Sequence, residues 1–165
     1  MKWNALVLGL ALVACNAPAG PLDLESMYRR SLKGAFAPDS RVERLDDVRQ
    51  ALANPEISAR ERVFGALLLL DSAEVGDMEL AHVTAERALD AGLEEARPVM
   101  AQAIDRALYL QGYPQKYGTQ YHRDEAGTWQ LYPVDQNTRD DERRAMGVPT
   151  LAEALARVRE LQSGR

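Results

Sequence analysis

The chain has 165 residues and carries 25 acidic against 20 basic side chains, which gives a net charge of −5 at neutral pH. With 46% hydrophobic and 27% charged residues, the composition is typical of one ordinary acidic globular domain. An acidic chain lacks the basic footprint that phosphate neutralisation needs, so we expect no nucleic-acid partner. One cysteine and two histidines leave almost nothing from which to build a disulfide framework, a zinc site or a Cys-His nucleophile pair. We therefore expect no metal and no cofactor.

The first fifteen residues have the layout of a secretory signal. Lys2 precedes the apolar run 5–13, which is followed by Ala14 and Cys15. So short an apolar run cannot cross a hydrocarbon core, which needs about 20 residues. We expect a signal peptide over residues 1–14 rather than a membrane span.

The four residues Leu-Val-Ala-Cys that end at Cys15 resemble the lipobox of bacterial lipoproteins. The resemblance implies that Cys15 receives a diacylglyceryl thioether, becomes the first residue after cleavage, and anchors the chain to a membrane. Several acyl chains, such as palmitate and diacylglycerol together, hold a protein firmly, whereas a single chain anchors only marginally. The alternative is an ordinary thiol at the end of a conventional signal peptide.

The lipobox resemblance also implies a location, the bacterial cell envelope. Asn16 follows the cysteine, and the absence of aspartate there favours the outer membrane, facing the periplasm, in a Gram-negative cell. Residues 15–22 contain two prolines and a glycine without a periodic pattern, which is typical of a short tether.

Residues 23–162 are expected to form a single, mostly helical domain. Apolar residues at helical spacing, bounded by capping and breaking residues, predict five consecutive helices within 24–34, 39–54, 58–70, 77–92 and 98–112. Ser58 and Glu61 fit a capping box at the start of the third. That helix is apolar on nearly every side, which predicts that it lies at the centre of the bundle. Short turns between the helices favour antiparallel packing.

Small residues gather on one face of the fourth predicted helix, where Ala81, Ala85 and Ala88 recur. This pattern resembles the second helix of a tetratricopeptide unit. A stacked array needs about three such units to bury a continuous core. We favour the alternative, an alanine-rich packing face within a bundle.

The character of the sequence changes after Gly112. Segments 117–123 and 128–132 are rich in Thr, Tyr and Trp around the turn 124–127, which predicts a β-hairpin that must pack on the helices to be stable. A short charged helix over 139–146, with a solvated face, and a last helix over 150–161 are expected to follow. The predicted fold is mainly α: an antiparallel bundle of about five or six helices with a small β-hairpin in the C-terminal third.

Residues 105–147 contain the most distinctive pattern in the chain. Its elements are Asp105-Arg106, Gln115-Lys-Tyr117-Gly118-Thr119-Gln120, Pro133-Val134-Asp135 and Arg143-Arg144-Ala-Met-Gly147. In this order they resemble a family of uncharacterised bacterial proteins over about residues 63–158. The resemblance implies fold kinship and a shared site, but no activity. One departure is the turn after Asp135, where the family tends to have proline and this chain has Gln-Asn-Thr.

Neighbouring residues on a helix diverge by about 100°, so Asp105 and Arg106 cannot be each other's partner on one face. If either is buried, it needs a partner from the motif or from Asp135, Arg143 or Arg144. We expect an ion-paired junction that pins the hairpin to the fifth helix, with a catalytic or ligand-binding role as the alternative.

The motif places polar side chains around a permissive glycine, Gly118. As a strand it would put Gln120 and His122 on one face and Tyr117 and Thr119 on the other. Gln120 could then point with His122 at a ligand or bond the backbone within the fold. We favour a structural polar clasp, because polar side chains beside irregular backbone usually satisfy it.

The expected function is a non-catalytic binding or scaffold module of the envelope, whose partner is a protein or a small polar ligand. The alternative is an enzyme in which Asp105, His122 or Asp135 acts as acid and base while Gln115 and Gln120 orient the substrate. A solvated His122 on the hairpin is the simpler interpretation of that residue. A cleft in which these groups converge would favour the enzyme, and a filled junction would favour the binding module.

Overall fold

The computed structural model describes residues 22–34 and 41–164, and the predicted signal peptide, Cys15 and most of the predicted tether lie outside them. The described residues form seven helices and one two-stranded antiparallel sheet, which confirms the predicted fold class. The elements are α1 (Leu24–Leu32), α2 (Arg41–Leu52), α3 (Ala59–Leu69), α4 (Val75–Asp90), α5 (Ala96–Leu110), β1 (Tyr121–Arg123), β2 (Trp129–Leu131), α6 (Asp140–Ala145) and α7 (Leu151–Gln162). No helix within the described ranges is long and apolar enough to span a membrane.

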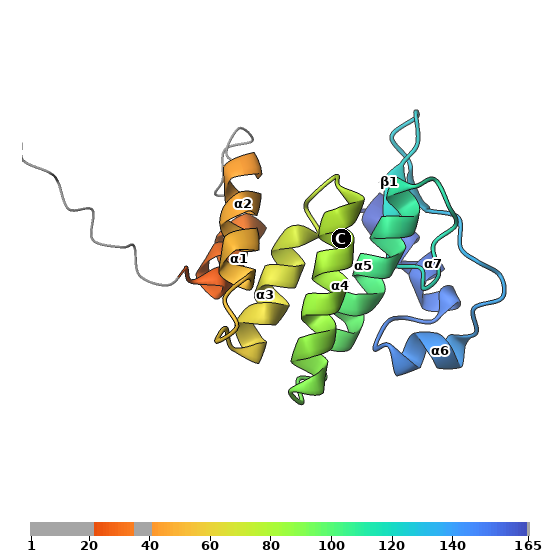
Figure 1. The fold of residues 1–165 in the computed structure, drawn as a ribbon. Coiled ribbons are helices and arrows are strands. Elements are labelled where there is room, and N and C mark those ends of the chain that lie inside the picture. The colour runs from red at the N-terminus through yellow and green to blue at the C-terminus, as the bar shows by residue number, and fades with distance from the viewer. Residues whose placement is uncertain (1–21, 35–40, 165) are drawn as a thin grey trace, which may run out of the picture.

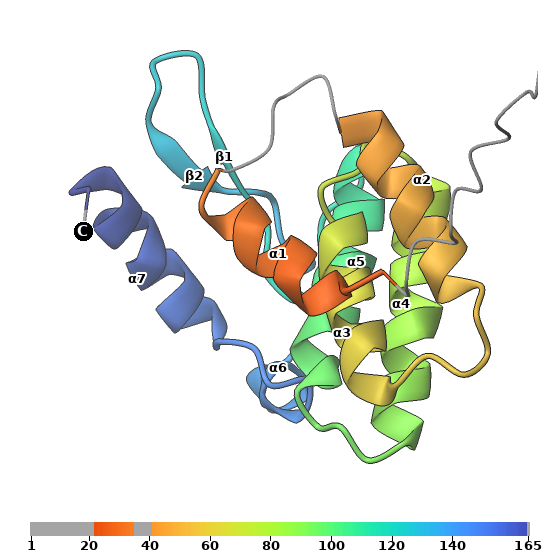
Figure 2. The same cartoon turned by 90° about the vertical axis from the view of Figure 1, so that its left-hand side faces the viewer.

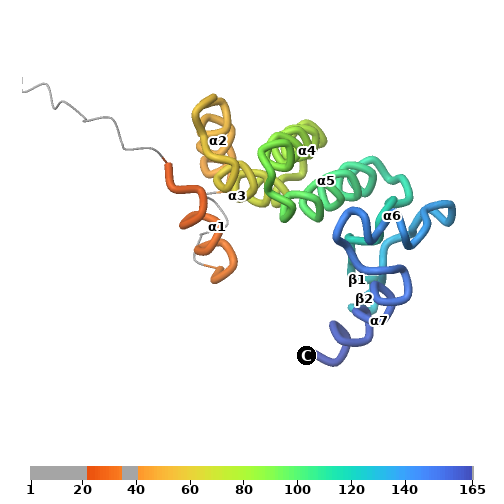
Figure 3. Tube along the Cα trace, turned by 90° about the horizontal axis from the view of Figure 1, so that it is seen from below, coloured from red at the N-terminus to blue at the C-terminus, as the bar shows by residue number. Residues whose placement is uncertain are grey.

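The first five helices pack in two layers. Helices α1, α3 and α5 form one layer, and α2 and α4 form the other (Figures 1 and 3). Helix α3 packs against α1, α2, α4 and α5, so the prediction of a central third helix is confirmed. The helices follow one another from α1 at one end of the molecule to α7 at the other (Figure 3). Both α1 and α7 lie on the side away from α2 and α4, as Figure 2 shows. The molecule is therefore curved, and its concave side holds α1, α5, the hairpin and α7 (Figure 3).

The main hydrophobic core fills the space between these two layers. The small residues of α4, Ala81, Ala85 and Ala88, are fully buried in it, which confirms the expected packing face. Gly65 permits a close approach of α2 to α3, because a β-carbon there would lie 2.6 Å from Leu52 Cδ2. The capping box at Ser58 and Glu61 is present as predicted, since each residue's side chain accepts the other's backbone N–H.

The hairpin is shorter than the sequence predicted. Strands β1 and β2 pair from Tyr121 opposite Leu131 to Arg123 opposite Trp129, and residues 117–120 lie outside them. The expectation that 117–120 continue the strand is wrong because the backbone N–H groups there are bound by side chains rather than by a neighbouring strand. Helices α4 and α5 each begin two residues before the predicted positions.

The C-terminal part attaches to the far side of α5 through a second, smaller core. Ala101 of α5, Tyr117 and Val148 form this cluster. Helix α7 packs along β2, where the Trp129 backbone N–H donates to Gln162 Oε1 at 2.9 Å. With so few apolar side chains, this part of the molecule depends on polar contacts to hold its position.

Candidate functional site

Asp105 lies on α5 and is fully buried. Its Oδ1 accepts the backbone N–H groups of Lys116 and Tyr117, both at 2.8 Å. Its Oδ2 accepts the backbone N–H of Thr119 at 2.9 Å and the Thr119 hydroxyl at 2.8 Å. A buried carboxylate is costly unless it is hydrogen-bonded, and these four donors satisfy it. Asp105 thereby holds the segment 115–120, called the motif loop below, against α5.

The expectation of an ion pair at Asp105 is wrong, and of the partners that the sequence allowed it is the motif itself that binds the carboxylate. Among the described residues its hydrogen bonds come from the main chain and from Thr119, and it forms no ion pair. The motif loop turns the backbone N–H groups of Lys116, Tyr117 and Thr119 toward α5, so the carboxylate gains the hydrogen bonds that a guanidinium would otherwise supply. Gly118 makes this turn possible because its φ of +92° lies in the region that glycine adopts without strain.

Gln115 closes the other side of the loop and is also fully buried. Its Nε2 donates to the carbonyls of Gln120 at 3.0 Å and Tyr132 at 2.8 Å, and its Oε1 accepts the Gln120 backbone N–H at 2.7 Å. Its own backbone pairs in a parallel bridge opposite Val134, donating to Pro133 O and accepting from Asp135 N. Gln115, rather than Gln120, is therefore the polar clasp that the sequence predicted.

Arg143 of α6 forms the third buried polar contact, with only 2% of its side chain exposed. Its Nε donates to Tyr117 O at 3.0 Å, and its Nη1 donates to Thr138 O at 2.7 Å and to Asp140 Oδ1 at 3.1 Å. The expectation of a solvated face for the charged run is wrong at this residue, because the guanidinium is needed to satisfy carbonyls that α6 and the motif loop bury. Asp140 also accepts the Leu151 backbone N–H, which lowers its pKa and ties α6 to α7.

Together, Asp105, Gln115, Tyr117 and Arg143 form a filled, hydrogen-bonded junction between α5, the motif loop and α6. Asp135 lies at its edge in a local turn, where its Oδ1 accepts the Asn137 backbone N–H at 2.9 Å. The geometry is that of a structural clasp.

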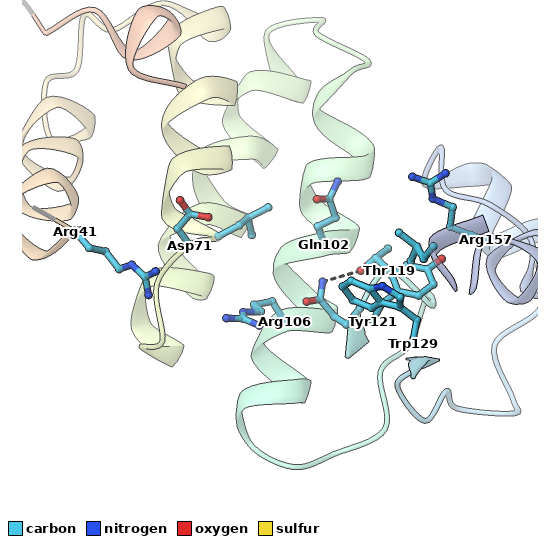
Figure 4. Close-up of a pocket in the computed structure, with 11 residues that line it drawn as sticks. Arg41, Asp71, Gln102, Arg106, Thr119, Tyr121, Trp129 and Arg157 are labelled. Carbon is cyan, nitrogen blue, oxygen red and sulfur yellow. Dashed lines mark hydrogen bonds between the residues drawn. The ribbon is translucent and has the colours of Figure 1, made fainter. Parts of the chain in front are cut away.

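A cleft lies beside this junction, and Thr119 belongs to both; Figure 4 shows the side chains that line the cleft. It has a volume of about 630 Å³ and is bounded by α5, the segment 119–121, β2, α7 and the ends of α2 and α3. Its lining residues are Arg41, Leu70, Asp71, Gln102, Arg106, Thr119, Gln120, Tyr121, Trp129, Arg157 and Leu161. Asp105 and Arg106 diverge as predicted: the first enters the junction and the second lines the cleft.

Two polar side chains on α5 line this cleft without a partner in the part of the chain that the structure describes. Gln102 and Arg106 are one helical turn apart and so share a face. Neither side chain forms a hydrogen bond or ion pair with a residue that the structure describes, and the Arg106 Nε is buried with no acceptor. The guanidinium lies near the Tyr109 ring, whose centroid is 5.2 Å from Cζ.

The charges that line the cleft are mostly positive. Arg41, Arg106 and Arg157 line it together with a single carboxylate, Asp71. Asp71 is 3.5 Å from Arg44, and Arg157 is paired with Glu160 at 2.6 Å, whereas Arg41 and Arg106 form no ion pair within the described ranges. This local excess of cations contrasts with the acidic balance of the whole chain.

The candidate acid and base residues do not meet in this cleft. Asp105, His122 and Asp135 line neither it nor the adjoining hollow beside α7. His122 is half-buried against Tyr132, with ring centroids 5.8 Å apart, and its Nδ1 is buried without a partner among the described residues. The interpretation of His122 as a solvated side chain is therefore wrong. The described residues contain no group of three or more potential metal ligands.

Sequence reasoning missed several residues of the cleft. Gln102 could have been found, because it lies four residues before Arg106 on the same helical face. Arg41, Trp129 and Arg157 come from distant segments, and no local pattern in the sequence connects them.

Comparison with known proteins identifies no relative: no protein family, no curated protein and no solved structure matches the chain.

Proposed function

We propose that the protein is a lipid-anchored binding module of the bacterial envelope, and that the cleft beside α5 binds an anionic ligand. The observation that carries the proposal is that Gln102 and Arg106, which lie in a cleft with a cationic lining, have no hydrogen-bond or ion-pair partner among the described side chains. A guanidinium presents a planar fork of donors that matches a carboxylate or phosphate, and a side-chain amide adds one donor and one acceptor. The anchor rests on the lipobox resemblance at Cys15.

The buried junction supports a binding role because it fixes the cleft. Thr119 and Gln120 lie in the cleft wall, and their backbone N–H groups are held by Asp105 and Gln115. A binding site gains affinity when its residues are already ordered before the ligand arrives. The buried side chains of the motif thus fix the position of its backbone, and the side chains of Thr119 and Gln120 line the cleft.

A non-catalytic role is favoured over an enzyme by the position of the acid and base candidates. Asp105 accepts four hydrogen bonds and is fully buried, so it is out of reach of a substrate. His122 and Asp135 do not line the cleft. General acid-base catalysis needs such a group within hydrogen-bonding distance of the reacting atoms. The resemblance to a family of uncharacterised bacterial proteins is part of this proposal and adds no activity to it.

The binding proposal is tested by NMR titration of the folded domain with sodium citrate and with sodium phosphate. We expect backbone amide shifts concentrated at 102–106 and 119–121, beyond those caused by sodium chloride at equal ionic strength. Arg106→Met should abolish them. Arg87→Met is the matched control, because Arg87 is an exposed arginine on α4, away from the cleft. Shifts that are absent, or unchanged by Arg106→Met, would contradict the proposal.

The anchor is tested separately by mass spectrometry of the N-terminal peptide from membrane-extracted protein. We expect a diacylglyceryl adduct on Cys15 and release from the membrane fraction in Cys15→Ser. An unmodified Cys15 in the membrane fraction would overturn the anchor and leave the binding proposal standing.

A further inference from the structure

The cleft continues into a second hollow along α7. This hollow has a volume of about 410 Å³ and shares four lining residues with the cleft: Gln102, Thr119, Tyr121 and Arg157. The two hollows therefore adjoin and form one trough, with Tyr121 and Gln102 at its middle. A trough of this form fits an extended chain better than a compact metabolite.

The two ends of the trough differ in chemistry. The end toward α2 and α3 carries Arg41 and Arg106, which have no carboxylate partner among the described residues. The end toward α7 has apolar walls from Pro98, Val148 and Pro149.

The two carboxylates at the α7 end already have partners. Glu153 caps α7 by accepting the backbone N–H and hydroxyl of Thr150, and Glu160 is paired with Arg157. They therefore do not supply a free anionic site. The α7 end is suited to an uncharged, partly apolar group, and the opposite end to a carboxylate.

Hydrogen-bonding groups line the trough between these ends. Gln102 offers a free side-chain amide, and the Gln120 amide donates only to Thr119 Oγ1, at 3.1 Å, which leaves its carbonyl oxygen without a donor among the described residues. Side-chain amides of this kind complement the N–H and C=O groups of a peptide backbone. The Trp129 ring lies against the Arg123 guanidinium at 4.8 Å and adds a rigid aromatic wall.

Resting on the proposed function, we infer that the trough binds an extended acidic peptide. A carboxylate of the peptide lies at Arg106, the Gln102 amide faces the peptide backbone, and an apolar side chain of the peptide lies between Pro98, Val148 and Pro149. Charge complementarity at one end and apolar walls at the other favour a peptide over an acidic glycan, whose sugar units carry polar groups throughout.

The experiment selects ligands from a mixture of synthetic hexapeptides with free carboxyl termini, using the immobilised domain and mass spectrometry. The same selection is run with Arg106→Met and with the control Arg87→Met, after circular dichroism has shown that both variants are folded. We expect the enriched peptides to contain aspartate or glutamate together with an apolar residue more often than the starting mixture does. Arg106→Met or removal of the peptide's carboxylate by amidation should weaken their binding about tenfold or more, and Arg87→Met should leave it unchanged.

Two further probes, tri-galacturonate and inorganic phosphate, are titrated against the same three proteins. If either binds in an Arg106-dependent manner while no peptide is enriched, the peptide inference is overturned and the binding site stands. If neither the peptides nor these probes bind through Arg106, both this inference and the proposed function fail. Peptides that bind equally well to Arg106→Met also overturn the inference.

Discussion

Two glutamines of the motif differ in what their side-chain amides contact. The Gln115 amide is fully buried and makes three hydrogen bonds to main-chain groups of Gln120 and Tyr132. The Gln120 amide is half-buried in the cleft wall and bonds one hydroxyl. The same residue type thus stabilises the fold at one position and is available to a ligand at the other.

The resulting prediction compares Gln115→Ala with Gln120→Ala. Gln115→Ala should lower the free energy of unfolding by at least about 2 kcal/mol, because each buried main-chain group left without a partner costs about 1–3 kcal/mol. Gln120→Ala should cost less than about 1 kcal/mol, since it leaves no buried backbone group unsatisfied. Urea denaturation of both variants measures the difference. Equal losses would show that Gln120 is also part of the clasp.

The sequence predicts part of this residue-scale arrangement. The divergence of Asp105 and Arg106 follows from the helical angle alone, and the structure confirms it. Which glutamine forms the clasp does not follow, because both lie in the same short loop and offer the same donor and acceptor. Gln115 takes this role because its backbone pairs with the segment 133–135. That contact joins segments far apart in sequence.

Helix α6 is too short to hold its position by its own hydrogen bonds, so its attachment depends on Arg143. Arg143→Lys should lower the free energy of unfolding by about 1–3 kcal/mol, because an ammonium group cannot reproduce the forked contacts with Tyr117 O, Thr138 O and Asp140. Arg144→Lys is the control, since Arg144 is exposed on the same helix. Thermal denaturation of the two variants tests this. Equal stability would mean that α6 is held by apolar contacts instead.

Helices α2 and α4 are joined by an ion pair with a predictable pH dependence. Arg49 Nε and Nη2 donate to Asp77 Oδ1 and Oδ2 at 2.7 and 2.6 Å. Burial by itself raises the pKa of Asp77, but the hydrogen bonds from Arg49 and Ser72 outweigh it and hold the pKa below the ordinary value of 3.8. A lowered folded-state pKa means that the pair stabilises the protein above the unfolded-state pKa. This stabilisation is lost as the pH falls through the folded-state pKa.

We therefore expect Asp77→Asn to lower the free energy of unfolding by about 1–3 kcal/mol at neutral pH, between the values for exposed and buried pairs. The difference from the parent should shrink as the pH falls below 3.8. Asp46→Asn is the control, because Asp46 also contacts Arg49 but its side chain is 69% exposed. Urea denaturation midpoints of the two variants and the parent, measured between pH 2 and 7, test this expectation. A difference that persists unchanged at the lowest pH would contradict the assigned role of Asp77.

At the scale of elements, the sequence predicts helices better than strands. Helical periodicity and the capping box at Ser58 depend on residues within a few positions of one another, and both are confirmed. The strand predicted over 117–123 begins only at Tyr121, because Asp105 and Gln115 bind the preceding backbone N–H groups. A composition rich in Thr and Tyr indicates extended backbone but does not show whether its partners are strands or side chains.

The whole molecule has two hydrophobic cores of unequal size, which meet at α5, and the part of the fold around each core is called a body below. The larger core unites α1 to α5, whereas the second core buries Ala101, Tyr117 and Val148 among the described residues, with Ile104 and Met146 partly buried against them. Hydrogen bonds from the motif loop to Asp105, and an edge-to-face contact between the Tyr109 and Tyr132 rings with centroids 4.7 Å apart, also attach the C-terminal part to α5. Regions with few buried apolar contacts open at a lower free energy than the global unfolding reaction. The cleft lies where the two bodies meet, since α2, α3 and α5 line one side and the hairpin and α7 the other.

The C-terminal part should therefore open before the rest of the molecule. In native-state hydrogen exchange, we expect backbone amides of β1, β2 and α7 to exchange through a smaller opening free energy than those of α3 and α4. Asp105→Ala should widen this gap, because it leaves three backbone amides of the motif loop, including the buried amide of Tyr117, without their acceptor while the larger core stays intact. Mass spectrometry of exchanged peptides measures both effects. If Asp105→Ala accelerates exchange in α3 and α7 by the same factor, the two bodies unfold as one unit, and the cleft between them is as rigid as the core.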